Sequence, residues 1–129
     1  MTPEHAAGPV VVFRAGRRRF ALPVHQVHEV LAYEAPRRVP GAPPFLVGVV
    51  EARGVVVPVL DLRARLGAGK RAPGDTARIL ALAVRGQVIG GVVDEVVAVQ
   101  PGGSDDVLDA DGLLEDHELR ALAGEAGEE

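Results

Sequence analysis

The histidines of the segment VHQVHEV, residues 24–30, are the first candidates for chemistry. His25 and His28 are three residues apart, and Glu29 follows directly. Side chains at positions i and i+3 share one face of a helix, and imidazole and carboxylate groups are common metal ligands. The spacing is therefore compatible with a metal-binding or small-ligand-binding regulatory barrel, for which His117 is a further candidate ligand. No third ligand stands at a defined spacing, so we favour two exposed histidines on a short turn.

Three carboxylates are candidates for general acids or bases. Asp61 ends one apolar run, and Asp94 and Glu95 interrupt another. Carboxylates at strand ends and bends commonly accept hydrogen bonds from backbone amides instead, and we favour that structural role. The nucleophile inventory is nearly empty, since the chain has no cysteine and Ser104 is its only serine. No phosphate-binding glycine loop is present either, so the sequence predicts a protein that is not an enzyme and needs no cofactor.

The composition describes a single valine-rich domain. The chain has 129 residues, of which 47% are hydrophobic and only 3% aromatic. β-Branched residues favour strands, and the 16 glycines and 10 prolines supply turns. The net charge of −4 and the shortage of aromatic rings argue against a nucleic-acid partner, because phosphates attract clustered basic residues and unpaired bases stack on aromatic side chains.

The distribution of charge along the chain gives further expectations. The segment RAGRRR, residues 14–19, is a basic cluster; we favour a solvated turn, with a docking patch for an acidic helix as the alternative. No apolar run approaches the ~20 residues of a bilayer span, and the N-terminus is polar. We therefore expect a cytoplasmic protein that does not insert into a membrane. Residues 1–8 are expected to be disordered and the acidic tail 124–129 to be mobile.

Short valine-rich runs between glycines and prolines predict a mainly β protein. Strands are expected at 10–14, 20–23, 77–84 and 88–99, with two more inside 46–62. A short helical turn followed by a strand is expected over 24–33, and an ordered proline-rich loop over 34–45. A helical turn from Leu62, a short strand within 107–114 and a helix over 115–122 with Asp116 as N-cap complete the chain.

Three positions interrupt otherwise regular strands. Arg53–Gly54 forms a corner between two strands, where glycine permits a positive φ. Pro58 lacks a backbone donor, so its strand is expected to lie at a sheet edge or to bend. Asp94–Glu95 would put one acid on each face of a straight strand, so we expect a bend or bulge there. Hinged strands of this kind are typical of small β-barrels.

The order of these features resembles the CheW-like domain. The matching stretches are FALPVHQVHEV, RRVPGAPPFLVGVVEARGVVVPVLDLRARLG and VIGGVVDEVVAV, in one register from Phe20 to Val99. The resemblance implies a domain over residues 9–123 built from two small SH3-like barrels and short helices, one of them at the C-terminus. It also implies a non-catalytic adaptor that couples the cytoplasmic tip of a methyl-accepting chemoreceptor to the regulatory domain of a CheA-like histidine kinase in bacterial chemosensory signalling.

The resemblance also assigns six positions to partner binding. They are Val27, Glu29, Arg53, Gly54, Gly90 and Val96. A valine on a short exposed turn and a glycine beside a bent strand are features that let a groove admit a partner helix. Core packing is an equally weighted alternative for Val27. Asp61 and Asp94 match recurrent acids of the family and are expected to be structural.

Two departures from the family pattern bear on these expectations. Glu51 replaces the usual Asn two residues before Arg53, so the two side chains could neutralise each other. After Val99 the chain lacks roughly 30 residues of the pattern, enough for a loop and at least one strand. The second barrel is then expected to be reduced, with an edge covered by the C-terminal segment, a partner or a second copy. Such reduced proteins resemble the small coupling proteins of Frz-type systems and are expected to keep one partner surface and lose the other.

Overall fold

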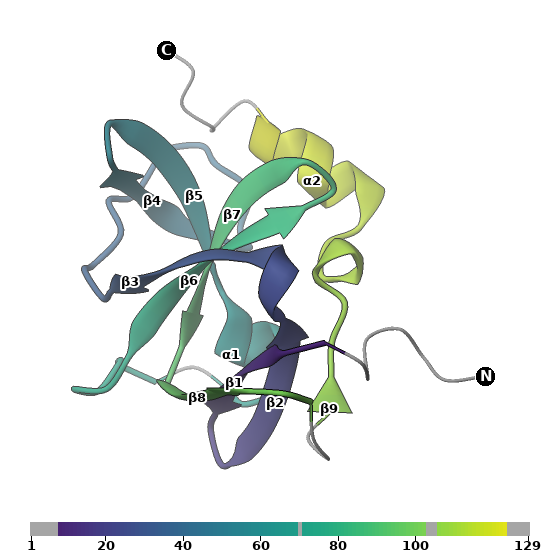
Figure 1. Ribbon diagram of the computed structural model, residues 1–129. Helices are drawn as coiled ribbons and strands as arrows, with labels where there is room; N and C mark the ends of the chain where they lie inside the picture. Colours follow the sequence, from purple (N-terminus) through teal and green to yellow (C-terminus); the bar gives the residue numbers. More distant parts are fainter. Residues whose placement is uncertain (1–7, 70, 103–105, 124–129) are drawn as a thin grey trace.

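The structure is a computed structural model that describes residues 8–69, 71–102 and 106–123. The expectations for residues 1–7 and for the tail 124–129 lie outside these ranges. Figure 1 shows short strands and short helical segments. In chain order they are β1 (Val10–Ala15), β2 (Arg18–Pro23), η2 (Val24–Gln26), β3 (Val27–Ala32), β4 (Leu46–Ala52), β5 (Val55–Asp61), α1 (Leu62–Arg65), β6 (Arg78–Val84), β7 (Gln87–Val93), β8 (Glu95–Gln100), β9 (Asp106–Val107), η3 (Ala110–Gly112) and α2 (Asp116–Ala123).

The strands form two sheets, which give the molecule two lobes (Figure 1). The four-stranded sheet has the order β8-β1-β2-β9 and combines the N-terminal hairpin with strands from the C-terminal third of the chain. The five-stranded sheet has the order β3-β6-β7-β5-β4 and uses only the middle of the chain. The predicted mainly β, two-lobed fold is confirmed. The smaller lobe is the four-stranded one, in which β9 is only 2 residues long.

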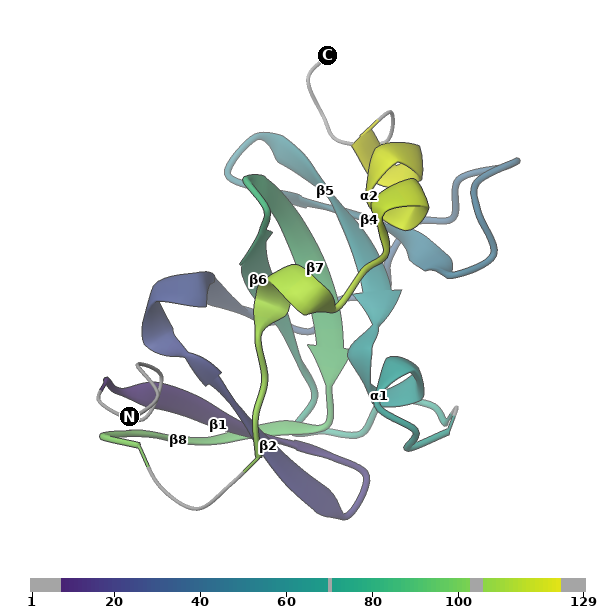
Figure 2. The same cartoon turned by 90° about the vertical axis from the view of Figure 1, so that its right-hand side faces the viewer.

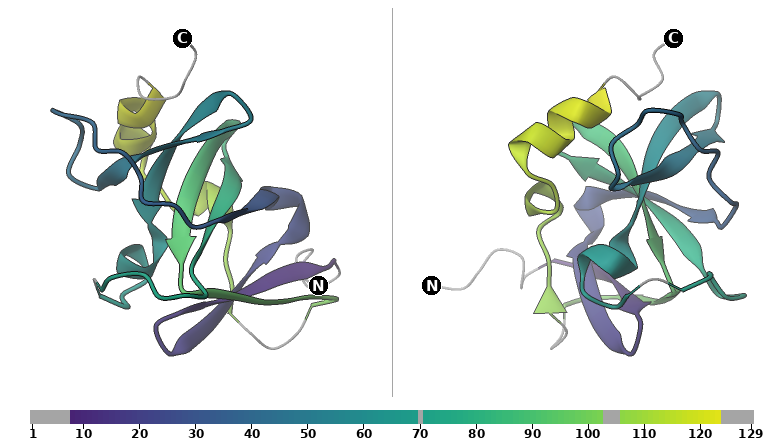
Figure 3. Two further views of the ribbon diagram at one scale, coloured as in Figure 1. Left: turned by 90° about the vertical axis from the view of Figure 1, so that its left-hand side faces the viewer. Right: turned by 180° about the vertical axis from the view of Figure 1, so that it is seen from behind.

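The five-stranded sheet curls until its two outer strands approach each other. Just beyond β3, Arg37 pairs with Val49 of β4 through backbone hydrogen bonds of 2.8 and 2.9 Å. Figure 3 shows this connection running across the outside of the sheet. Gly48 permits the close approach, because a β-carbon there would lie 2.5 Å from the carbonyl oxygen of Arg37. The buried residues inside the curled sheet are Val50, Val57, Val59, Ile79 and Val92.

The main hydrophobic core joins both sheets to the C-terminal helix. The rings of Phe13 and Phe20 stack in the β1–β2 hairpin with 5.9 Å between their centroids. They belong to the same buried cluster as Leu80 of β6 and Leu122 of α2. Figure 2 shows α1 and α2 on the same side of the five-stranded sheet. The helix α2 therefore adds Leu119 and Leu122 to the core that both sheets share.

The structure confirms three local predictions. The chain after Pro23 forms the short 3-10 helix η2 and then the strand β3. The helical turn α1 begins at Leu62, whose side chain is fully buried. The strand β7 ends at Val93 and β8 begins at Glu95, so the chain changes sheets at Asp94. This change of sheet is the bend that two adjacent acids predicted.

The predicted edge position of Pro58 is wrong, because β5 is an interior strand of its sheet. Pro58 lies opposite Val49 of β4. The N–H and the carbonyl oxygen of Val49 both form hydrogen bonds with Arg37, on the side of β4 away from Pro58. On the other side of β5, the ladder between β5 and β7 begins only at Val59. Neither neighbouring strand therefore needs the N–H that proline lacks.

The segment expected to be a strand within 107–114 is mostly not one. Only Asp106–Val107 pair with β2, and Ala110–Gly112 form the 3-10 helix η3. Asp109 caps this helix by accepting a hydrogen bond from the N–H of Asp111. Short acidic side chains compete in this way with ladder hydrogen bonds, which explains why the apolar residues around them did not extend the strand.

The helix α2 is confirmed, but its predicted N-cap is wrong. Asp116 is the first helical residue, and its carboxylate pairs with the guanidinium of Arg85. Glu115 precedes the helix, and its N–H donates to Glu118 Oε1 at 2.9 Å. This is the return bond of a capping box, in which the acid at the third helical position satisfies the N–H of the residue before the helix.

Candidate partner-binding site

The turn between β4 and β5 places Arg53 at the surface in a costly backbone conformation. Ala52 pairs with Val55, so Arg53 and Gly54 are the only two loop residues. Their φ angles are 56° and 81°, as in a type I′ hairpin turn. Glycine adopts positive φ freely, but an L-residue with a side chain costs about 1–2 kcal/mol there. The 80% exposure of the Arg53 side chain shows that packing does not offset this cost.

The curling of the five-stranded sheet brings the Arg53 side chain next to Glu29 of β3. The Arg53 Nη2 and Glu29 Oε2 atoms are 3.0 Å apart, although β3 and β4 are at opposite ends of the strand order. The ion pair of Arg53 is thus with Glu29 and not with its chain neighbour Glu51. An exposed ion pair contributes only about 0–1 kcal/mol, so it does not account for an arginine at this position.

A shallow groove lies beside this ion pair. Its volume is about 200 Å³, and both Glu29 and Arg53 line it. Leu31 of β3 and Ala52 of β4 contribute apolar surface, and Glu34 and Glu51 add two more carboxylates. The groove therefore combines a short apolar floor with charges of both signs, which can hold one apolar side chain and a polar backbone of a partner.

Arg85 occupies a turn of the same kind, but its side chain contacts other parts of the fold. Arg85 and Gly86 connect β6 to β7 with φ angles of 47° and 87°. The N–H of Arg85 donates to Asp111 Oδ1 at 2.8 Å, and its guanidinium donates to the Leu114 carbonyl oxygen at 2.8 Å and pairs with Asp116. These contacts hold the C-terminal segment against the sheet. The described residues offer Arg53 no comparable contact.

The other predicted partner-binding residues are spread over both lobes. Val27, the first residue of β3, is half-buried and packs partly against the main core. Val96 of β8 is half-buried opposite Phe13 in the other sheet. Gly90 of β7 is buried. The structure therefore brings Glu29, Arg53 and Gly54 together but leaves Val96 in the other lobe.

Gly90 is needed inside the sheet for packing. A β-carbon at this position would lie 3.0 Å from the Cγ2 atoms of both Ile79 and Val59. These side chains belong to the interior of the curled sheet. Any contribution of Gly90 to a partner surface is therefore indirect, through the close packing of strands β5, β6 and β7.

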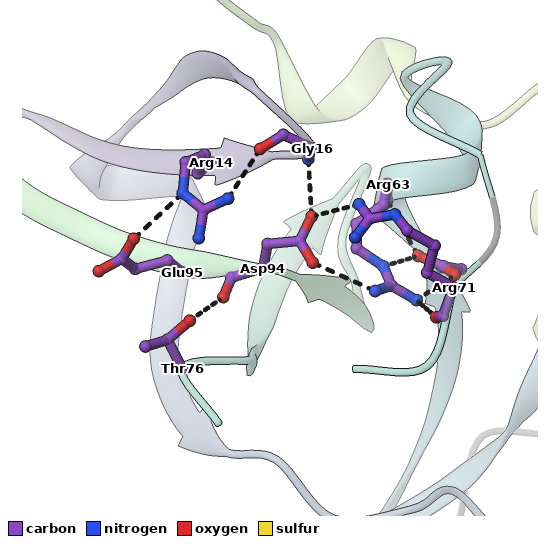
Figure 4. A network of polar contacts seen from close by, with 8 residues as sticks. Arg14, Gly16, Arg63, Arg71, Thr76, Asp94 and Glu95 are labelled. Atoms are coloured by element: carbon purple, nitrogen blue, oxygen red, sulfur yellow. Dashed lines mark hydrogen bonds and ion pairs between the residues drawn. The ribbon is translucent and has the colours of Figure 1, made fainter. Parts of the chain in front are cut away.

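A buried network around Asp94 ties the two lobes together (Figure 4). Asp94 Oδ2 accepts hydrogen bonds from the Gly16 N–H at 2.6 Å and from Arg71 Nη2 at 3.2 Å. Asp94 Oδ1 accepts from Arg63 Nη1 at 3.2 Å. The hydroxyl of Thr76 donates to the Asp94 carbonyl oxygen at 2.7 Å. Asp94 therefore has the structural role that its position predicted.

Asp61 has a similar role at the end of β5. Its carboxylate accepts a hydrogen bond from the N–H of Arg63 at 3.0 Å and so caps α1. Arg63 also donates from Nε and Nη2 to the two carboxylate oxygens, each at 2.9 Å. The hydrogen bond to Asp61 is the largest cause of the raised pKa of Arg63, which stays charged despite its burial.

Contacts with arginine side chains lower the pKa values of Asp94 and Glu118. Burial on its own raises the pKa of Asp94, but the hydrogen bond from the Gly16 N–H and the hydrogen bond and charge of Arg63 together hold that pKa below its ordinary value. On α2, a bidentate hydrogen bond from Arg65 lowers the pKa of Glu118. Both carboxylates are therefore ionised at neutral pH and act as acceptors.

The histidine hypothesis gains no support from the geometry. His25 and His28 are both exposed, one on η2 and the other on β3. Within residues 8–69, 71–102 and 106–123, no group of three His, Cys, Asp or Glu side chains is placed to hold a metal ion. Over the same ranges, no helix has the length and apolar character to cross a bilayer.

Sequence reasoning missed Arg85 and Arg63. The signal for Arg85 is present, since the dipeptide Arg–Gly occurs at both 53–54 and 85–86 between valine-rich runs. Arg63 stands two residues after Asp61, the spacing of an N-cap and its helix. Its contact with Asp94 joins positions 31 residues apart and has no local signal.

A curled five-stranded sheet, a four-stranded sheet that shares its core and an exposed, strained turn define a small two-lobed β scaffold. The model of the CheW-like domain matches residues 9–124, and the chain belongs to this family. The crystal structure of scaffolding protein TtCheW from Thermoanaerobacter tengcongensis has a similar fold, with a TM-score of 0.69 at 34% identity. That similarity covers 76% of this chain and 67% of the TtCheW chain.

Curated relatives include chemotaxis and Frz proteins. Chemotaxis protein CheW of Bacillus subtilis is 40% identical over 96 residues, which are 74% of this chain and 62% of that protein. Protein FrzA of Myxococcus xanthus is 38% identical over 85 residues, which are 66% of this chain and 52% of FrzA. The chain thus spans 62% and 52% of the lengths of these two relatives. The predicted resemblance to CheW-like and Frz-type proteins is confirmed.

Proposed function

We propose that this protein is a non-catalytic adaptor of bacterial chemosensory signalling. In this role it couples the cytoplasmic tip of a methyl-accepting chemoreceptor to the regulatory domain of a CheA-like histidine kinase, and it works in the cytoplasm without nucleic acid. Relatives named as chemotaxis protein CheW and as a scaffolding protein support the proposal. The observation that carries it in this chain is the exposed Arg53 turn.

Arg53 is suited to bind a partner for a physical reason. The positive φ of Arg53 destabilises the folded backbone, and the exposed ion pair with Glu29 offsets little of that free energy. A guanidinium has five N–H donors, and the described part of the chain offers it only the Glu29 carboxylate. The remaining donors are available to carbonyl or carboxylate oxygens of a partner that lies over the adjacent groove.

The six predicted residues contribute to this surface in different ways. Glu29 and Arg53 form the polar end of the groove, and Gly54 gives the turn its shape. Val27 and Val96 add half-buried apolar surface on the two lobes. A partner that touched both valines would span both lobes, as a receptor hairpin or a second β domain could.

The proposal is tested by measuring association with each partner separately. The full chain is titrated with a purified receptor cytoplasmic fragment and with a purified kinase regulatory domain, and binding to at least one is expected. Arg53→Glu should weaken that binding by about tenfold or more, because it replaces the guanidinium donors by a carboxylate that repels the partner oxygens they would bind. Arg120→Glu is the matched control, since it makes the same charge change on the exposed face of α2.

The two titrations also show which partner surfaces the chain has. Binding to one partner alone would define an adaptor with a single docking surface, and light scattering of the free protein would reveal self-association. A well-folded preparation that binds neither partner would overturn the proposal. An unchanged melting temperature for Arg53→Glu is part of the expected result, because that side chain is exposed.

A further inference from the structure

A second groove lies in the other lobe, away from the Arg53 turn. It is formed by the β1–β2 turn and by the segment that follows α1, and its volume is about 540 Å³. Its charged lining residues are Arg14, Arg17, Arg18 and Arg71. These are four of the chain's 14 basic residues, in a protein whose net charge is −4. Every charged residue that lines this groove is therefore basic.

The floor of the groove is apolar. Ala15 is buried in the main core, and Leu66 and Ala68 are half-buried and pack against the same core. Gly16 and Gly67 expose backbone between these side chains, both with positive φ angles. The groove thus offers an apolar strip bordered by guanidinium groups.

The two walls of the groove are held in place by Asp94. Its buried carboxylate accepts hydrogen bonds from the Gly16 N–H in one wall and from Arg71 in the other (Figure 4). Arg14 donates to the Gly16 carbonyl oxygen at 2.8 Å, which fixes the turn further. A surface that is already ordered before binding loses less conformational entropy when a partner docks.

The guanidinium groups keep unused donors. Arg14 pairs with Glu95 and Arg18 with Asp106, but both arginine side chains remain at least 36% exposed. Arg17 is exposed, and the described residues offer it neither a hydrogen bond nor an ion pair. Since a guanidinium has five donors in a fork that fits a carboxylate, several of them are free for an anionic partner.

We propose that this groove binds an acidic segment of a partner protein, one that carries carboxylates on either side of at least one apolar side chain. The carboxylates would pair with Arg17, Arg18 and Arg71, and the apolar side chain would lie on Leu66. Nucleic acid fits less well, because no aromatic ring lines the groove for base stacking. The inference uses other residues than the proposed coupling function and stands independently of it.

The test uses the full chain and short fluorescein-labelled peptides, with binding followed by fluorescence anisotropy. A peptide of glutamate and leucine is expected to bind, and its affinity should fall as salt is raised, because salt screens exposed charges. Replacing its leucines by serine should weaken binding, and replacing its glutamates by lysine should abolish it. A short DNA duplex serves as the competing class of polyanion.

Variants localise the binding. Arg17→Glu should raise the dissociation constant of the glutamate–leucine peptide about tenfold, since it places a like charge at the groove. Arg38→Glu makes the same charge change on the exposed β3–β4 connection and should leave the constant within about twofold, because Arg38 does not line the groove. Arg53→Glu should also leave it unchanged, which separates this site from the coupling surface.

Three results would overturn the inference. The first is no binding of the glutamate–leucine peptide at low salt. The second is an equal loss in Arg17→Glu and Arg38→Glu, which would show attraction to net charge alone. The third is DNA binding that is tighter than peptide binding and depends on Arg17. Arg17→Ala, which removes the charge of an exposed side chain without reversing it, should show a smaller loss in the same direction.

Discussion

Asp94 and Gly16 are joined by a hydrogen bond of 2.6 Å between the carboxylate oxygen Oδ2 and the backbone N–H. Asp94 stands where the chain passes from the five-stranded to the four-stranded sheet, and Gly16 lies in the turn between β1 and β2. Arg63 of α1 donates to the other carboxylate oxygen at 3.2 Å. One buried carboxylate thus fixes the two lobes and the helix relative to one another.

Asp94→Asn should lower the free energy of unfolding by about 3 kcal/mol, the low end for breaking a buried ion pair. The loss is at the low end because Arg63 keeps its contacts with Asp61. Urea unfolding measures it. Glu95→Gln, which removes an ion pair that is more than one-third exposed, is the matched control and should cost less than about 1 kcal/mol. Equal losses in the two variants would contradict the role of Asp94.

Stability should fall in acid because Asp94 and Glu118 have lowered pKa values. The pKa of Asp94 lies below its ordinary 3.8 and that of Glu118 below its ordinary 4.5. The unfolded chain therefore binds these protons more readily than the folded chain. The stabilisation is present in full above the ordinary values and is lost as the pH falls through them toward the folded values.

The pH dependence is measured as the free energy of unfolding between about pH 7 and about pH 3. The wild-type curve should decline over the acidic part of this range, and the curve of Asp94→Asn should decline less steeply. Arg65→Gln, which removes the bidentate partner of Glu118, should also flatten it. Parallel curves for the wild type and Asp94→Asn would show that Asp94 does not contribute.

Local chemistry made the hairpins and the change of sheet predictable. Valine-rich runs around Arg53–Gly54 predicted two strands and a tight turn, and adjacent acids at Asp94–Glu95 predicted a bend. Both signals lie within a few residues of the feature that they predict. The contact between Arg53 and Glu29 has no such signal, because it exists only once the five-stranded sheet has closed.

Two errors have the same origin. Pro58 was expected at an edge or a bend because proline lacks an N–H, yet β5 is an interior strand in which Pro58 faces Val49, whose backbone groups bond to Arg37, and the ladder with β7 begins only at Val59. Asp116 has a typical N-cap side chain, but Arg85 from a distant hairpin engages it. In both places tertiary contacts override a local preference.

Gly48→Ala should destabilise the five-stranded lobe. The added β-carbon would lie 2.5 Å from the backbone oxygen of Arg37, and backbone cannot move aside as a flexible side chain can. We expect a loss of about 1–3 kcal/mol or more, as for other overpacked sites. Thermal unfolding followed by circular dichroism measures it.

Gly74→Ala is the control for that substitution. No heavy atom lies within 4 Å of the position of its β-carbon, and its φ is not in the left-handed region. Alanine there should leave the free energy of unfolding unchanged or raise it by about 0.4–1 kcal/mol, because alanine lowers the conformational entropy of the unfolded chain. A similar effect of the two substitutions would mean that Arg37 does not approach β4 closely.

The two Arg–Gly turns allow a direct comparison between an arginine proposed to bind a partner and a structural one. Both arginines have positive φ, with values of 56° for Arg53 and 47° for Arg85. Glycine at either position relieves a cost of about 1–2 kcal/mol. Arg53→Gly loses in return only an exposed ion pair, worth about 0–1 kcal/mol, so its stability should match or exceed that of the wild type.

Arg85→Gly should instead be less stable than Arg53→Gly. It loses the guanidinium hydrogen bond to the Leu114 carbonyl oxygen, and bonds of charged groups contribute about 1.5–3 kcal/mol. It also loses the contact with Asp116 that holds the start of α2. Partner titration should give the opposite order, with Arg53→Gly the weaker binder. A stable Arg85→Gly, or an Arg53→Gly that binds partners as the wild type does, would show that the structure does not divide these roles between the two turns.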